Sequence, residues 1–335
     1  TFQLGEDWMA YVTTGIDGQY QERRNPRDFG TYVRSGSGSH PEGETVNVGG
    51  YAQAELVWND RITLIPGMRI DYSNASVGSY VDGSGNTINL NEEKSAVGYS
   101  PKLAAMIKMS DWLGVFGSVA HTERLPSLDE VFSNYVVNDL DKELSNNFEA
   151  GVTFSFDDLI MGGDAFRLKG TAFRNNVTNY YASYWNGSTV VTEIIPKARY
   201  EGLELEASYW TESIYGSLGA SLIRGNNVSN GGYMNAVPAD SAFLKIGYVY
   251  RPWILDFGWK GDFYAAQDRV GADEQETAGY VLHNLYAAWK PTDGFMADSE
   301  VRFNVDNVFD KSYRNHLSED EGAGRSFKLS FAKKF

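Results

Sequence analysis

The chain contains no cysteine, which excludes a disulfide-stapled scaffold and a cysteine-based zinc site. Only four histidines are present, so a metal-dependent or hydrolytic centre has few imidazoles to draw on. No apolar run approaches the roughly 18 residues that a transmembrane helix needs, and the mean hydropathy is −0.38. The net charge is −15, which argues against nucleic acid as a partner. Two classes stay open: a soluble β protein, and a membrane protein that crosses the bilayer with strands.

Aromatic residues, in contrast, are abundant and make up 14% of the chain. Transmembrane β-barrels carry girdles of aromatic side chains at both membrane interfaces. Alternating strands can also hide a membrane span behind a polar average hydropathy. The aromatic content therefore favours the membrane class.

Apolar and polar residues alternate along much of the chain, with the two-residue period of a β-strand. In residues 253–263, for example, Phe257 and Trp259 alternate with Asp256 and Lys260. Charges of both signs lie opposite the apolar face, where a polar lumen tolerates them and a sandwich core does not. The pattern predicts an all-β fold, a transmembrane antiparallel β-barrel, with a two-sheet soluble β protein as the alternative.

About fourteen strands can be placed from this period. They are expected near residues 7–21, 45–58, 61–74, 97–108, 111–122, 144–156, 165–175, 199–210, 213–223, 240–250, 253–264, 279–290, 299–306 and 325–335. Short connections alternate with long ones, as periplasmic turns alternate with extracellular loops in outer-membrane barrels. The long connections, expected outside the cell, are 22–44, 75–96, 123–143, 176–198, 224–239, 265–278 and 307–324. No segment has a helical period.

Several segments carry motifs that recur in one known protein family. The strand 325–335 ends on an aromatic residue, as the closing strand of an outer-membrane barrel does, where the terminal aromatic is the assembly signal. Residues 307–313 (NVFDKSY) and 324–327 (GRSF) are similar to the C-terminal signature of that family. Residues 200–206 (YEGLELE) are similar to one of its recurring strands, and residues 123–132 (ERLPSLDEVF) resemble a segment of its haem and haemoglobin receptors. By these motifs the chain resembles TonB-dependent outer-membrane receptors, and the resemblance covers the whole chain.

Receptors of this family close about 22 strands around a plug. The resemblance therefore implies that residues 1–335 are the C-terminal part of a single transmembrane β-barrel domain, and that the N-terminal plug and first strands are absent from this chain. Fourteen strands cut from a larger barrel leave two unpaired edges, which is prohibitive in lipid. A complete fourteen-stranded passive outer-membrane channel is the alternative.

The resemblance also implies a function. We expect an integral protein of the Gram-negative outer membrane that imports an iron compound, haem or a haemoprotein-derived ligand, energised through a TonB-type coupling protein that acts on the missing N-terminal part. A ferric-siderophore receptor is the alternative within this family. The expected partners are the lipid bilayer, lipopolysaccharide, the coupling protein and a haemoprotein. No enzymatic activity and no intrinsic cofactor are expected, because no nucleophile elbow or phosphate loop is present.

Candidate ligand residues follow from the chemistry of haem iron, whose axial ligands are imidazole or tyrosinate. His40 and His316 lie in long loops, and His121 lies where the fifth strand meets the loop 123–143. The haem branch is expected to carry an axial histidine between residues 127 and 140. Here that interval contains none, and Tyr135 is its only residue that can ligate iron.

Three further features have two interpretations each. Arg124 is a candidate for an anionic group of the ligand, or for pairing with the neighbouring Asp129 or Glu130. The acidic stretches 139–143 and 319–321 suit either divalent cations or solvated loop charge and lipopolysaccharide contacts. The metal-binding residues, if any, stay unknown at this point. His283, in phase with apolar strand residues, is expected to face lipid.

Overall fold

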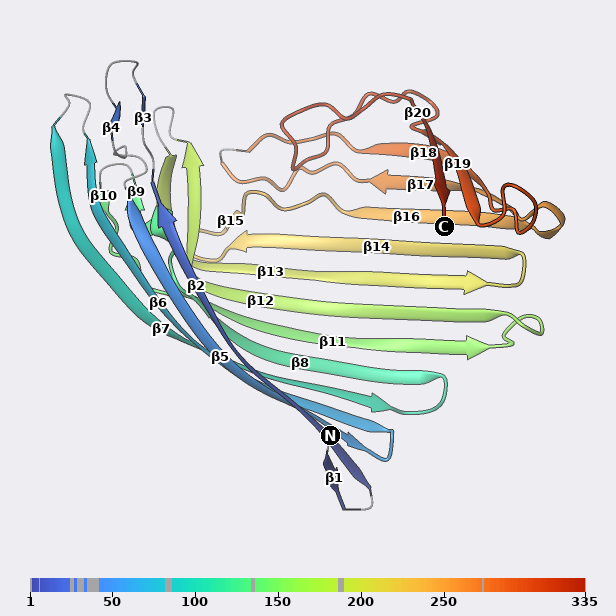
Figure 1. Ribbon diagram of the computed structural model, residues 1–335, viewed down its shortest axis with the longest axis horizontal. Coiled ribbons are helices and arrows are strands. Elements are labelled where there is room, and N and C mark those ends of the chain that lie inside the picture. The colour runs from blue at the N-terminus through green and yellow to red at the C-terminus, as the bar shows by residue number, and fades with distance from the viewer. Residues whose placement is uncertain are drawn as a thin grey trace. The chain divides into compact units, whose positions relative to one another are not determined.

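The computed structural model describes residues 2–5, 7–24, 27–28, 33–34, 42–81, 86–133, 136–185, 190–272 and 274–334. These residues form one 16-stranded antiparallel sheet in which nearly every strand lies beside its sequence neighbour (Figure 1). The strands in sheet order are β1 (Phe2–Leu4), β2 (Trp8–Arg23), β5 (Gly43–Trp58), β6 (Ile62–Val81), β7 (Thr87–Lys108), β8 (Leu113–Arg124), β11 (Glu143–Asp157), β12 (Ala165–Trp185), β13 (Val190–Trp210), β14 (Ile214–Asn227), β16 (Ser241–Tyr250), β17 (Leu255–Tyr264), β18 (Tyr280–Trp289), β19 (Ser299–Asp306) and β20 (Ser326–Lys333). The short strand β15 (Gly232–Tyr233) pairs with β14.

The remaining described elements lie in the connections. Two small ladders are formed by β3 (Arg27–Asp28) with β4 (Val33–Arg34) and by β9 (Phe132–Ser133) with β10 (Val136–Val137). There are also a helix α1 (Leu128–Val131) and a 3₁₀ turn η1 (Arg251–Trp253). None of the helices in the described residues is long and apolar enough to cross a membrane.

The all-β prediction is confirmed, and each of the fourteen expected strands has a counterpart among the described elements. Two expected loops are wrong, however. Strands β6 and β7 run on through most of residues 75–96, and β12 and β13 run on through most of 176–198. These extensions contain many Gly, Ser, Asn and Thr residues, a composition typical of loops. Their apolar residues, such as Ala75, Val77 and Val177, are buried rather than exposed in a lipid-facing band.

One short helix, α1, lies in the connection 123–143. Ser127 and Glu130 form a capping box at its N-terminus. Val131 and the adjacent Phe132 are fully buried against Ala75 and Val77 of β6. Because the period of one helical turn is too short to detect, the Ser-x-x-Glu spacing was the available signal.

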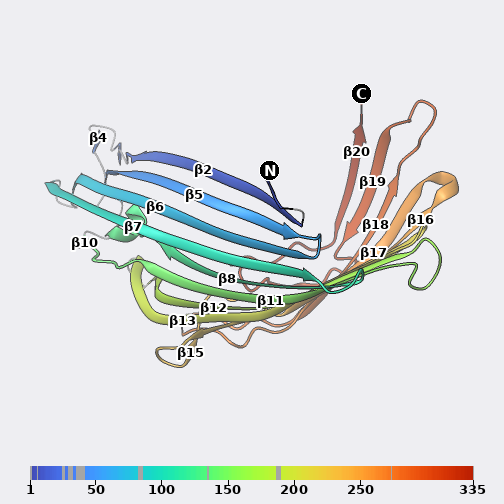
Figure 2. The same ribbon diagram turned by 90° about the horizontal axis from the view of Figure 1, so that it is seen from below.

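The chain divides into two compact units, each of which is described by itself. The first holds residues 1–106, 117–148 and 175–199, and the second holds residues 107–116, 149–174 and 200–335. In the second unit the short turns lie together at one end of the strands, the short-turn end, and the long loops lie at the other, the long-loop end (Figure 1). Strands β16 to β20 are consecutive neighbours (Figure 2).

The register confirms the two-faced reading of the strands. In the second unit, Phe257 lies opposite Tyr248 and Ala287, and this apolar surface is called the outward face. The next position of the same strand, Asp256, lies opposite Val249 and Ala288 on the polar inward face. Outward apolar side chains are widely exposed, namely Ile246, Phe257, Leu285, Phe303 and Leu329. Exposed apolar side chains on one sheet face are the lipid-facing band of a membrane β-barrel.

Candidate ligand-binding site

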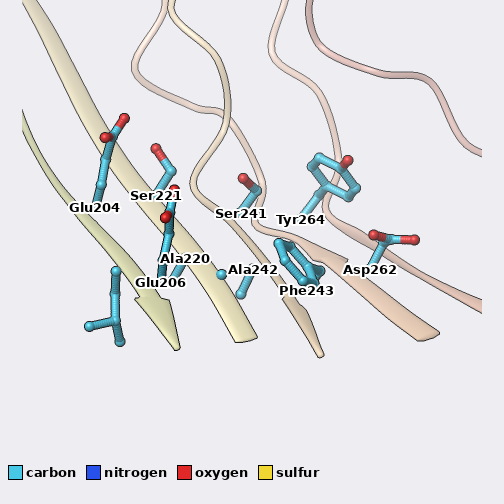
Figure 3. A pocket seen from close by; sticks show the side chains of 11 residues that line it. Glu204, Glu206, Ala220, Ser221, Ser241, Ala242, Phe243, Asp262 and Tyr264 are labelled. Atoms are coloured by element: carbon cyan, nitrogen blue, oxygen red, sulfur yellow. The ribbon is translucent and has the colours of Figure 1, made fainter. Parts of the chain in front are cut away.

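A hollow of about 280 Å³ lies on the inward face of the second unit (Figure 3). Its polar and aromatic lining is Glu204 and Glu206 of β13, Ser221 of β14, Ser241 and Phe243 of β16, and Asp262 and Tyr264 of β17. Asp262 already accepts hydrogen bonds from Asn284 (2.9 Å) and pairs with Lys260 (2.6 Å). A wall of carboxylates favours water or cationic groups over the carboxylates of haem or of a siderophore.

In the first unit, Arg124 is held by two carboxylates. Its Nη1 donates to both oxygens of Glu130 (3.0 and 2.9 Å), and its Nε and Nη2 donate to Glu143 (3.2 and 3.3 Å). The guanidinium also lies 4.5 Å from the ring centroid of Tyr181, which is buried. Of the two interpretations for Arg124, the structure shows pairing with Glu130, while Asp129 pairs with Arg23.

This cluster keeps the Glu130 carboxyl ionised. Burial alone would raise its pKa, but the hydrogen bonds from Arg124 and Ser127 outweigh burial, and the pKa is lowered. Tyr181 adds a hydrogen bond from its hydroxyl to the Asp141 carbonyl. Sequence reasoning missed Tyr181, which lies beyond the expected end of its strand, and it listed Glu143 in an acidic stretch without predicting its pairing with Arg124.

His121, the second candidate from this region, lies on β8 in phase with the exposed Val119. Its Nδ1 is 2.9 Å from Oδ1 of Asn146, which is in phase with the exposed Phe148 of β11. Its Nε2 is 3.5 Å from Glu123, whose other oxygen pairs with Lys142 (2.5 Å). His121 therefore contacts residues on the outward face of the sheet. It does not belong to the cluster around Arg124.

His316 lies in the connection 307–325 of the second unit, and its side chain is 2% exposed. Its Nδ1 is 2.9 Å from the hydroxyl of Thr277. Its Nε2 is 3.2 Å from Glu274 but outside hydrogen-bond geometry, and Glu274 accepts the backbone N–H of Ala236 (3.1 Å). His316 therefore joins three long connections and is enclosed by them, so a ligand cannot reach it without their opening.

The other predicted residues divide into two groups. His40 and Tyr135 lie outside the described residues. His283 is on the outward side of β18, where its Nδ1 accepts a hydrogen bond from Trp259 (3.2 Å). Its ring packs edge to face against the ring of Phe309, with 5.1 Å between the two centroids. This placement agrees with the expected outward orientation of His283.

The acidic stretch 139–143 shows loop pairing. Asp139 pairs with Lys94 (2.6 Å), which lowers the pKa of Asp139, and Glu143 belongs to the Arg124 cluster. Across the described residues, no group of three or more histidine or acidic side chains has the arrangement of a metal site.

The chain can be compared with known proteins on this basis. It is 27% identical over 282 residues to "TonB-dependent heme receptor A" of Haemophilus ducreyi, which covers 71% of this chain and 38% of that protein. It is 24% identical over 296 residues to a "Hemin receptor" of Yersinia pestis, which covers 82% of this chain and 42% of that protein.

Two solved structures have a similar fold. The copper transporter OprC matches with a TM-score of 0.81 at 20% identity, over 97% of this chain and 54% of that one. The hemophore receptor HasR of Serratia marcescens, in complex with its hemophore HasA and heme, matches with a TM-score of 0.78 at 19% identity, over 98% and 56%. The chain thus spans 38% to 42% of the length of these curated relatives and 54% to 56% of these solved chains.

The family described as "TonB dependent receptor-like, beta-barrel" has a sequence profile that matches residues 1–308. This match takes in thirteen of the fourteen long strands, from β2 to β19. The chain belongs to the TonB-dependent receptor-like β-barrel family.

Proposed function

We propose that the chain is part of an outer-membrane receptor that takes up haem or a haemoprotein-derived iron compound. The observation that carries this proposal is the sequence similarity to haem and hemin receptors, which extends over 71% to 83% of the chain. Members of the family are integral proteins of the bacterial outer membrane, and the chain has this location. Energy coupling through a TonB-type protein, and contact with a haemoprotein and lipopolysaccharide, are part of the proposal.

We also propose that residues 1–335 are the C-terminal part of a larger barrel domain with a plug. Among the described residues, β20 pairs only with β19, and the opposite edge of the sheet is the short β1. Unpaired backbone donors and acceptors are costly in lipid. Further strands that pair with these edges would remove that cost. A passive channel formed by the chain alone is the competing arrangement.

The long connections between the strands are the part of this receptor that we assign to ligand capture. Arg124 in the first unit and His316 in the second unit already have protein partners, and His121 contacts residues on the outward face of the sheet. The ligand test therefore begins with His40 and Tyr135 and keeps the three described candidates as further variants. A role for Arg124, His121 or His316 requires the opening of the contacts described above.

The test uses the full-length receptor and haem. The parent is expected to give a shifted Soret band on binding haem, and alanine in place of one axial ligand among His40, Tyr135, His121 and His316 should weaken or alter that band far more than the other variants do. His283→Ala is the matched control, because this histidine lies on the outward face.

Two outcomes would contradict parts of this proposal. If the parent binds haem and all four variants bind like the parent, these ligands are wrong but the haem function stands. If the parent shows no haem binding and instead binds a ferric siderophore that supports growth, the siderophore function replaces the haem function.

A further inference from the structure

The turn between β11 and β12 carries three consecutive exposed apolar side chains. The exposed fractions are 48% for Leu159, 72% for Ile160 and 53% for Met161. Two of the other short turns, Asn59-Asp60 and Thr211-Glu212, have polar tips. Three neighbouring exposed large apolar residues are unfavourable in water and indicate a surface that meets an apolar partner.

The turn holds these side chains in a fixed arrangement. The buried carboxylate of Asp164 accepts the backbone N–H groups of Leu159 (2.7 Å), Ile160 (2.9 Å) and Met161 (2.9 Å). The Tyr209 hydroxyl donates a fourth hydrogen bond at 2.9 Å. Burial alone would raise the pKa of Asp164, but these donors outweigh it and the pKa is lowered, so the clamp is ionised at neutral pH.

A second carboxylate closes the base of the turn. Asp158 accepts the backbone N–H of Gly163 (2.6 Å), and the Asp158 N–H donates to the Asp164 carbonyl (3.0 Å). Gly163 has a φ of +83°, which glycine adopts without strain. Both acidic residues of the turn, Asp158 and Asp164, therefore bind its backbone, and the tip of the turn is left apolar.

The tip adjoins the outward aromatic surface of the second unit. Trp112 stacks on Phe154 (6.1 Å between centroids) and on Phe156 (5.5 Å), and Phe156 stacks on Phe166 (6.4 Å). Phe156 is the penultimate residue of β11, so the turn begins directly beyond this stack. In an outer-membrane barrel such a stack at the strand ends forms the interfacial girdle.

The turn lies at the short-turn end of its strands (Figure 1). On the opposite, inward face of these strand ends, Arg167 pairs with Asp157 (2.7 Å) and lies over the ring of Trp210 (5.3 Å).

We propose that Leu159, Ile160 and Met161 form a lipid anchor that inserts into the phospholipid leaflet bordering the short turns. The occupant is lipid because the tip continues a surface that already faces lipid. The Asp164 clamp fixes the backbone of the anchor, and its N–H groups are satisfied inside the turn, so the tip enters the leaflet without unpaired donors.

The absence of cysteine from the chain allows a site-specific test. Ile160→Cys is made in the full-length receptor, with any cysteine outside residues 1–335 replaced by serine, and is labelled with a nitroxide. The labelled protein is reconstituted in bilayers of phosphatidylethanolamine and phosphatidylglycerol. Electron paramagnetic resonance then measures collisions of the label with oxygen, which partitions into lipid, and with a water-soluble nickel chelate.

The matched control is Glu212→Cys in the turn between β13 and β14, where the glutamate side chain is 78% exposed. We expect the label at position 160 to collide mainly with oxygen and the label at position 212 mainly with nickel. Equal nickel accessibility at the two positions overturns the proposal, since the tip then faces water.

Exclusion of both reagents from position 160 also overturns it, because the label is then buried against protein. Heat-modifiable migration in gels checks that each labelled variant is folded. If Ile160→Cys fails this check, Met161→Cys carries the same test, since its side chain is also more than half exposed.

Discussion

The middle of the strands and the long-loop end of the second unit are organised by different rules. In mid-strand, the face on which a side chain lies follows from its place in the two-residue period of the strand. Leu205 of β13 is apolar and outward, and the next residue, Glu206, lines the inward hollow. At the long-loop end, position follows from buried polar contacts between distant segments. The buried amide of Gln267 donates to the carbonyls of Val237 (2.9 Å) and Pro238 (3.2 Å) in another loop.

This difference separates what the membrane specifies from what the protein specifies. Every second residue of a strand that borders lipid faces the lipid, and the only requirement on it is that it be apolar. A loop has no such external reference, so its backbone polar groups must find partners within the protein. The region that we assign to ligand capture is therefore the region in which single polar side chains decide the conformation.

The largest expected effect on stability comes from placing a charge on the outward face in mid-strand. Leu205→Arg places a charge on the outward face and should lower the free energy of unfolding by about 2–4 kcal/mol if the side chain lies near the bilayer midplane. Glu206→Arg, one residue away on the inward face, should cost much less. Denaturant unfolding of the full-length receptor in bilayers measures both, and equal costs would contradict the assignment of the two faces.

A smaller effect is expected where the long loops interlock. Gln267→Leu keeps the volume of the side chain but leaves the Val237 and Pro238 carbonyls without their donor, at a cost of about 1–3 kcal/mol. The neighbouring backbone pairs between Gln267 and Thr277 should then exchange amide hydrogen faster.

Gln275→Leu is the control for this change, because Gln275 is an exposed glutamine in the same connection. Hydrogen exchange of the Thr277 amide should be unaffected by the control. Unchanged protection in Gln267→Leu would mean that the loops are held by other contacts, and would remove the contrast with the strands.

The sequence predicted the strands well because lipid imposes a period that can be read without knowing the partners. It predicted the loops poorly for the same reason. The strand extensions of β6 and β12 have the Gly, Ser, Asn and Thr content that is typical of a loop, and Tyr181 lies on one of them. The enclosure of His316 depends on Thr277 and Glu274, which are about 40 residues away and carry no local signal. The ionic pairing of Arg124 with Glu130 was the exception, because a capping-box spacing brings Glu130 close.

The smallest expected effect concerns an ionic contact in the same loops. Asp240 binds Arg224 (2.8 Å) and Arg269 (3.3 Å), and the pairing with Arg224 lowers its pKa below the ordinary 3.8, against the opposing effect of burial. A lowered pKa means that this contribution is complete above the unfolded value and is lost as the pH falls through the folded value. Because both arginines are about one-third exposed, we expect less than about 1 kcal/mol at neutral pH.

Asp240→Asn tests this contact with an isosteric change that removes the charge. The difference between parent and variant in the temperature of loss of heat-modifiable migration should be present at pH 7 and should shrink as the pH falls below 3.8. High salt at pH 7 should also reduce the difference, because partly exposed ion pairs are screened. A difference that persists unchanged at low pH and high salt would show that Asp240 acts through neutral hydrogen bonds. Its contribution would then be of the same kind as that of Gln267, and not that of a partly exposed ion pair.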